Sequence, residues 1–204
     1  MKKVKYILIL ILFTSFTIQS SFYDGIYEYK SDRFYERITL GKDFKFKYDF
    51  HWHNISYSLN GNYRVKGDSL ILDSNPQRDK LIVRESKKGN ANNLKFCIND
   101  KLGEHFNYSL HLINKNKDTL NLCNQWKSSK IKGKKIESFY ITDSKGLKTP
   151  LYPIKGIRTN YFEIQMETIR VFDNEVWKMN SKSIRPKGMD GENQDYKLEK
   201  TKSH

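Results

Sequence analysis

Proline, glycine and cysteine are scarce in this chain. Its 204 residues include four prolines, eleven glycines and two cysteines. So little proline and glycine argues against extended disorder, except at the C-terminal end. The sequence also lacks any window in which apolar residues recur with a helical period between capping residues. We therefore expect a folded chain that is not built from helices.

Enzyme signatures are missing as well. The chain has no Gly-x-Ser-x-Gly elbow, no His-Glu-x-x-His pair and no phosphate-binding glycine loop. We identify no catalytic residue and no cofactor, so a non-catalytic protein is favoured. A hydrolase whose acidic residues meet only in the folded chain stays the alternative, because residues distant in sequence can converge in space.

The N-terminus has the composition of a secretory signal peptide. Lys2, Lys3 and Lys5 precede an apolar run at 6–13 and a small, polar region, which predicts a signal peptide over residues 1–21. The apolar run is too short to cross a bilayer comfortably as a permanent helix, although an uncleaved anchor stays an alternative. No cysteine near its end could accept a lipid. We expect an exported protein that is periplasmic, attached to the cell envelope or secreted, without a permanent membrane span.

The chain is strongly basic. Its formal charge is +14, and residues 1–20 hold three lysines and no acid, so the exported part would still carry +11. A basic balance favours attraction to acidic polymers or anionic surfaces. In an exported protein, nucleic acid is the less expected partner. The lysines are spread along the whole chain, which favours a generally solvated surface over one dedicated patch.

The segment at 43–53, DFKFKYDFHWH, alternates rings with polar residues. Aromatic residues occupy the even positions from Phe44 to Trp52, and charged residues and histidines occupy the odd ones. Because successive side chains point to opposite faces of a strand, this period predicts a strand with one buried aromatic face and one wet face.

Further short strands are expected on both sides of this segment. Their patterns lie at 23–30, 34–40, 55–65 and 80–85, with turns at 41–43, 53–54 and 67–68 and with Leu70 and Leu72 in one more strand. Asn60–Gly61 fits either a tight turn or a bulge inside one strand at 55–65. The shared phase of the apolar residues on both sides favours the continuous strand.

The order of these turns and strands resembles a known family. The motifs are Gly25-x-Tyr27, the aromatic strand after Gly41-x-Asp43, Gly61-Asn62-Tyr63, Gly67-Asp68-Ser69-Leu70 and Leu72. They are similar to the lipocalin-like β-barrel modules of exported bacterial proteins, which are mostly uncharacterised. The resemblance implies an up-and-down meander or small barrel over residues 22–86. The segment is short for a ligand-holding cup, so we expect a filled barrel.

The second half has strand patterns of its own. Residues 87–93 have the composition of a linker, and many short strands separated by turn clusters at 94–200 predict a β-sandwich. The segment IESFYITDSKGLKTPLYPI at 136–154 resembles the regulatory-type sandwich domains attached to exported bacterial proteins. A disordered tail is expected at 201–204. The predicted fold is therefore all-β, a small antiparallel meander or barrel followed by a β-sandwich.

A His-x-His pair provides the clearest candidate for a metal site. His51 and His53 stand on the polar face of the aromatic strand, where both rings would point the same way as ligands for zinc or copper. A site would need further ligands, for which His105, His111, Asp49 and Glu28 are candidates. The alternative is two solvent-facing strand histidines.

The two cysteines could form a disulfide after export. Cys97 and Cys123 both lie on the face opposite the apolar positions of their strands. A bridge is possible in an oxidising compartment if those strands are neighbours. The alternative is two thiols that do not pair. Neither cysteine has a local histidine that would make it a catalytic residue.

Two tryptophans beside lysines are candidate partner contacts. Trp126 and Lys127 lie in a basic loop, and Trp177 precedes another lysine, so the rings could stack on sugars while the lysines attract acidic groups. The alternative is that each ring covers a core. We therefore expect an exported, non-catalytic binding or envelope-associated protein whose partner is acidic or carries carbohydrate, and whose ligand is unknown.

Overall fold

The described chain consists of β-strands joined by turns. The computed structural model describes residues 23–89, 93–132 and 135–201, and in this part of the chain there are sixteen strands and no helix. The predicted all-β class is thereby confirmed. The described residues accordingly contain no helix that could span a membrane. The predicted signal peptide, and residues 202–204 of the predicted tail, lie outside the described residues.

Eight strands form a closed antiparallel barrel. Going round the barrel, each strand pairs with the next and the last pairs with the first. In chain order the strands are β1 (Gly25–Ser31), β2 (Phe34–Leu40), β3 (Lys45–Trp52), β4 (Ile55–Lys66), β5 (Ser69–Ser74), β14 (Glu175–Met179), β15 (Ser183–Arg185) and β16 (Leu198–Lys200). Every barrel neighbour is therefore also the next barrel strand along the chain, which is the up-and-down order.

The barrel interior is filled by rings. Phe46, Tyr48 and Phe50 of β3 are buried, as their alternation predicts. The ring centroid of Tyr48 lies 5.2 Å from that of Phe172 and 5.7 Å from that of Trp177. The two ends of the predicted aromatic face are different, because Phe44 has a φ of 60° in the preceding turn and Trp52 is 44% exposed at the end of the strand.

β4 is one continuous strand that serves two neighbours. Its first part pairs with β3 and its last part pairs with β5, and Gly61 takes part in both pairings. A Cβ at Gly61 would lie 2.0 Å from the carbonyl oxygen of Asp73 and 2.6 Å from the ring of Phe46. Only glycine permits this close approach. The continuous strand expected from the sequence is confirmed.

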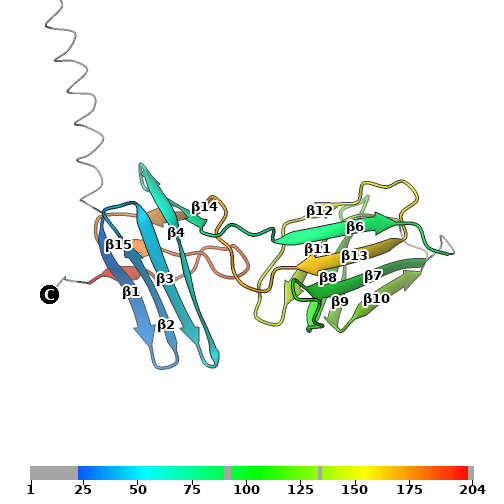
Figure 1. Cartoon of the computed structure of the whole chain (residues 1–204), viewed down its shortest axis with the longest axis horizontal. Coiled ribbons are helices and arrows are strands. Elements are labelled where there is room, and N and C mark those ends of the chain that lie inside the picture. The colour runs from blue at the N-terminus through cyan, green and yellow to red at the C-terminus, as the bar shows by residue number, and fades with distance from the viewer. Residues whose placement is uncertain (1–22, 90–92, 133–134, 202–204) are drawn as a thin grey trace, which may run out of the picture. The chain divides into compact units, whose positions relative to one another are not determined.

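The barrel is made from two separate stretches of sequence, which differs from the expected contiguous domains. The first compact unit includes residues up to Gln77 together with 171–188 and 193–204, and the second includes 78–170 with 189–192. Figure 1 shows β14 and β15, in orange, beside the blue and cyan strands of the first unit. The strand patterns at 94–200 predict strands for the sandwich without showing that the last three belong to the barrel, because periodicity identifies a strand but does not identify its partner.

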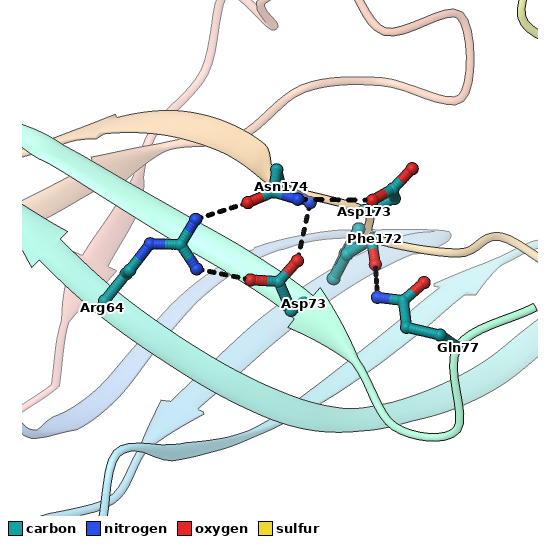
Figure 2. Close-up of polar contacts among 6 residues, drawn as sticks. All are labelled: Arg64, Asp73, Gln77, Phe172, Asp173 and Asn174. Atoms are coloured by element: carbon teal, nitrogen blue, oxygen red, sulfur yellow. Dashed lines mark hydrogen bonds and ion pairs between the residues drawn. The ribbon is translucent and has the colours of Figure 1, made fainter.

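Hydrogen bonds join the two chain segments where they leave and re-enter the barrel. The amide of Ser74 donates to the carbonyl of Phe172 (2.9 Å), whose own amide donates to the Ser74 hydroxyl (2.9 Å). Asp73 accepts from the amide of Asn174 (2.7 Å) and pairs with Arg64 (2.7 Å). Figure 2 shows Asp73, Arg64 and Asn174 converging, with Arg64 also donating to the Asn174 side chain. Residues 78–170, which are inserted between the two barrel stretches, thus leave the β5–β14 pairing intact.

The second unit is a sandwich of two four-stranded sheets. One sheet has the order β10-β7-β13-β6 and the other the order β12-β11-β8-β9. The strands are β6 (Leu81–Ser86), β7 (Asn93–Asp100), β8 (Tyr108–Asn114), β9 (Thr119–Gln125), β10 (Ser128–Lys132), β11 (Ile136–Asp143), β12 (Tyr152–Pro153) and β13 (Tyr161–Met166). Its core is a cluster of buried residues in which Phe96 stacks on Phe162 with the ring centroids 4.5 Å apart. The predicted barrel and sandwich are both present.

Candidate functional site

The outward side chains of β6, β13, β7 and β10 form a regular polar surface, which we call the outer face. On each strand the alternate residues, such as Phe96, Phe162 and Ile164, are buried in the sandwich core, so the residues between them point outward. Cross-strand register arranges the outward residues in rows. The rows are Ser86, Tyr161, Lys95 and Lys130, then Arg84, Glu163, Cys97 and Ser128, then Ile82, Gln165 and Asn99.

A shallow groove of about 310 Å³ crosses this face. It is lined by Ile82, Arg84, Cys97, Asn99, Tyr161, Glu163, Ile164 and Gln165. Its lining residues belong to β6, β13 and β7, which lie side by side in the sheet, as Figure 1 shows. Glu163 is the one carboxylate among the outward residues of these strands, against several lysines and an arginine. The groove lining itself holds one cation, Arg84, and one anion, Glu163, whereas Lys95 and Lys130 add positive charge beside it on the same face.

Tyr161 lies at one end of the groove between lysines. The Lys88 ammonium is 3.6 Å from the centroid of the Tyr161 ring, and the Lys95 ammonium is 5.6 Å from it. Lys88 also pairs with Glu163 at 3.2 Å, and the hydrogen bond to Glu163 is the main reason why its pKa is raised. The hydrogen bond with Cys97, 3.4 Å from sulfur to oxygen, raises the pKa of the Tyr161 phenol. The phenol therefore stays neutral and the lysine stays charged at neutral pH.

Trp126 lies in the turn before β10, the strand at the opposite edge of the sheet from β6. Its ring is 50% exposed and meets His105 edge to face at 6.1 Å, and His105 in turn contacts the side chain of Asn99 at 2.7 Å. Lys127 has a φ of 63°, and the amide of Ser128 donates to the carbonyl of Trp126 (2.8 Å), which makes this a γ-turn of the rare, strained kind. The turn is held against β7, because the amide of Ile98 donates to the carbonyl of Lys127 (3.1 Å).

The two rings are separated by the length of a short oligomeric ligand. Tyr161 pairs with Lys95, whereas the Trp126 turn bonds to Ile98, three residues further along β7. At roughly 3.3 Å per residue, the two backbone positions are offset by about 10 Å along β7, with Tyr161 on β13 and Trp126 in the turn between β9 and β10. Rings at that spacing, with flat polar side chains between them, suit an extended ligand that carries hydroxyl and acidic groups.

The structure does not bring the expected metal ligands together. His51 is at the end of β3, where its Nδ1 lies 2.6 Å from the Ser56 hydroxyl, and His53 is in the next turn with a φ of 50°. The expected strand therefore ends between them. The other candidates have partners of their own, since Asp49 pairs with Lys47, Glu28 with Arg37, His105 with Asn99 and His111 with Asn121. Across the described ranges, no group of three or more His, Cys, Asp or Glu could hold a metal ion.

The two cysteines are free thiols, which corrects the expected disulfide. Cys97 belongs to β7 and Cys123 to β9, and these strands lie in different sheets of the sandwich. Both side chains alternate with core residues, so they point out of opposite faces. The prediction required neighbouring strands, and alternation alone could not test that requirement.

The tryptophans have different environments. Trp177 is completely buried in the barrel, where its indole N–H donates to Glu175 (2.7 Å), so it is not the surface contact that the sequence suggested. Its alternative, a ring that fills a core, is correct. Trp126 and Lys127 are exposed beside the outer face, and their role as partner contacts stays a prediction.

Sequence reasoning missed most of the outer face. Tyr161, Glu163 and Gln165 alternate with buried residues in β13, and this pattern was a readable signal for a polar surface. It did not show that the outward residues of β7 would lie beside them, because that parallel pairing joins distant segments.

Glu36, inside the barrel, is a further residue that was not predicted from the sequence. It shares the inward phase of Ile38 and Leu40 and is 1% exposed inside the barrel, where it accepts hydrogen bonds from Tyr48 (2.7 Å) and from Tyr196. A charged residue on an otherwise apolar phase was the available signal. With both phenols bound to it, this carboxylate ties the chain before β16 to the barrel interior.

Comparisons with protein-family models, with curated proteins and with solved structures find no match to this chain.

Proposed function

We propose that this is an exported, non-catalytic binding protein that holds an acidic glycan across the outer face of its sandwich. The barrel serves as the scaffold, and its closed up-and-down order is compatible with the lipocalin-like barrels of exported bacterial proteins. The barrel interior is filled by rings, and a hollow of about 380 Å³ on the barrel, which Gly41, Gly61 and Asn75 help to line, has no exposed ring in its lining. The sandwich is therefore the unit to which we assign binding.

The observation that carries the proposal is the composition of the groove. Arg84, Asn99 and Gln165 present planar hydrogen-bonding groups, which suit the hydroxyl groups of sugars. Tyr161 adds a ring, and Lys88, Lys95 and Lys130 add charges that suit carboxylate or sulfate groups. An acidic ligand would compete with Glu163 for Lys88 and so uncover the Tyr161 ring.

Binding to an immobilised acidic polysaccharide such as polygalacturonate, with neutral dextran as the comparison, tests this function. We expect retention of the chain on the acidic polymer at physiological salt and release at high salt, because exposed charges are screened. Tyr161→Ala and Arg84→Ala should each weaken retention about tenfold or more, since a ring stack or a charged hydrogen bond is worth roughly 1–3 kcal/mol.

Tyr140→Ala is the matched control. Tyr140 lies on the outer face of the other sheet and also carries a lysine over its ring, Lys148 at 4.6 Å. Equal losses in the Tyr140 and Tyr161 variants would contradict the assignment to this face, and so would retention on dextran alone. Release of reducing ends from the polymer would instead favour the alternative, a hydrolase.

A further inference from the structure

A loop at one end of the sandwich presents a fully exposed isoleucine. Ile157 lies between β12 and β13 and is 102% exposed, more than any other large apolar residue of the described chain. Its neighbours Lys155 and Arg158 are exposed as well. A single exposed apolar residue is ordinary, so the loop is of interest because of how it is held and what surrounds it.

The loop is fixed by one carboxylate. Glu85 accepts hydrogen bonds from the amides of Lys155 (2.8 Å) and Gly156 (2.7 Å) and from the hydroxyls of Tyr152 (3.0 Å) and Thr159 (2.9 Å). A Cβ at Gly156 would lie 2.0 Å from the Thr159 hydroxyl oxygen, so the turn is closely packed. The loop backbone that carries Ile157 is thus already ordered. Little conformational entropy would be lost if the Ile157 side chain became buried against a partner.

Asn160 fastens the end of the same loop. Its side chain accepts from the amide of Lys88 (2.7 Å) and donates to the carbonyl of Lys88 (2.9 Å), and its own amide donates to the carbonyl of Ser86 (3.1 Å). The loop is therefore joined to the end of β6 on both sides of Ile157.

The strand register gathers cations at this end of the sandwich. The start of β13 lies beside the end of β6 and the start of β7, and the end of β10 pairs with that start of β7. The exposed cations that follow these strand ends, or lie on the loop, are Lys87, Lys132, Lys135, Lys155 and Arg158. The acids nearby in sequence are Glu137 and Glu85, and Glu85 is occupied by the loop. This end is therefore basic around an apolar tip.

The opposite end of the same sheet provides an internal comparison. Leu102 is 86% exposed in the loop that follows β7, and Asp100 and Glu104 lie beside it in the sequence. Lys101 is its only adjacent cation in the sequence, and the two acids outnumber it. Of these two exposed tips, Ile157 is the one around which cations outnumber acids.

We propose that the Ile157 loop docks on an anionic lipid surface, with Ile157 entering the acyl boundary and the surrounding cations lying at the headgroups. Membrane association at an interface combines buried apolar area with attraction to anionic lipids. This loop has both components on a preformed support. The proposal does not depend on glycan binding, because the outer-face groove and Ile157 use different side chains.

Co-sedimentation with phospholipid vesicles tests the proposal. The chain from Ser21 onward is used, since every described strand lies after that point and the apolar N-terminal run could itself bind lipid. Vesicles of phosphatidylcholine with a quarter of phosphatidylglycerol should bind it, and pure phosphatidylcholine should bind it at least tenfold more weakly. Ile157→Ser should weaken binding to the anionic vesicles about tenfold, whereas the matched variant Leu102→Ser should leave binding unchanged.

Insertion is measured separately with Ile157→Trp and brominated phosphatidylcholine. Bromine quenches only indoles at the acyl chains, so the variant should lose fluorescence that the unsubstituted chain retains. Unchanged melting temperatures for the position 157 and 102 variants show that folding is not the cause. Absence of binding to anionic vesicles, equal effects of the two serine variants, or binding that salt abolishes and Ile157→Ser does not change would each overturn the proposal.

Discussion

The Glu85 carboxylate is predicted to stabilise the sandwich through the loop that it anchors. Each of its oxygens accepts one backbone N–H and one hydroxyl. In Glu85→Gln one oxygen becomes an amide nitrogen, which cannot accept. The hydroxyl on that side can rotate, but the backbone N–H cannot. At least one hydrogen bond to a charged acceptor is lost, and we expect a cost of roughly 1.5–3 kcal/mol.

The pH dependence follows from the direction of the Glu85 pKa. Partial burial acts to raise this pKa, but the hydrogen bonds from Lys155, Gly156, Thr159 and Tyr152 outweigh it and hold the pKa below its ordinary value of 4.5. The unfolded chain therefore binds the proton more readily than the folded chain does. The stability difference between the unsubstituted chain and Glu85→Gln is complete above that ordinary value and is lost as the pH falls through the lowered one.

Urea unfolding of the full chain at pH 7 and at acidic pH measures this difference. With a slope of about 1–3 kcal/mol per molar urea, the midpoint of the sandwich should fall by on the order of 1 M. Hydrogen exchange should locate the effect at the amides of Lys155 and Gly156. Glu163→Gln is the matched control, because this carboxylate is 51% exposed with Lys88 as its ion-pair partner, and it should cost less than about 0.5 kcal/mol. A cost for Glu85→Gln as small as the control's, or one that persists undiminished in acid, would refute the reasoning.

Three further outcomes are expected in the barrel and at the sandwich surface. Gly61→Ala should destabilise the barrel by about 1–3 kcal/mol in urea unfolding, because its Cβ would overlap a backbone oxygen, whereas Gly67→Ala has open space and should cost about 1 kcal/mol for its φ of 61°. Trp177→Ala should cost about 3–5 kcal/mol and Trp126→Ala less than about 0.5 kcal/mol, since the first is buried and the second half exposed. Burial raises the pKa of Tyr27 and that of Tyr152 to about 12, so an alkaline absorbance titration should find two phenols that ionise after the others, and stability should fall above pH 10, where the unfolded chain releases those protons first.

The sequence was sufficient to predict those features of the fold that depend on the alternation of side chains within one strand. Alternation in β3 identified the inward residues Phe46, Tyr48 and Phe50, and the shared phase on both sides of Gly61 identified β4 as one strand. Side-chain alternation follows from the strand backbone itself, so a single segment contains this information. The positions that failed were at strand ends, such as Phe44 and His53, where a positive φ ends the alternation.

Partner choice was not predictable in the same way. The disulfide expectation failed because Cys97 and Cys123 have the correct phase but lie in different sheets. The outer face was missed for the same reason, since its rows join β7 to β13 across more than sixty residues. Phase states which way a side chain points, whereas a site also requires knowing which strand lies beside it, and that is decided by the packing of the whole unit.

The insertion itself shows how two folds share one chain without disturbing each other. On the barrel side, Ser74 and Phe172 exchange hydrogen bonds, so the outgoing and returning segments are already neighbours. On the sandwich side, Leu81 pairs with Met166, and the amide of Glu167 donates to the carbonyl of Lys80 (3.0 Å). Each unit therefore brings the same two chain segments together by its own strand pairing. Neither unit leaves the other to bear the entropic cost of closing a long loop. The sandwich surface can therefore change in sequence while the barrel ladder stays the same.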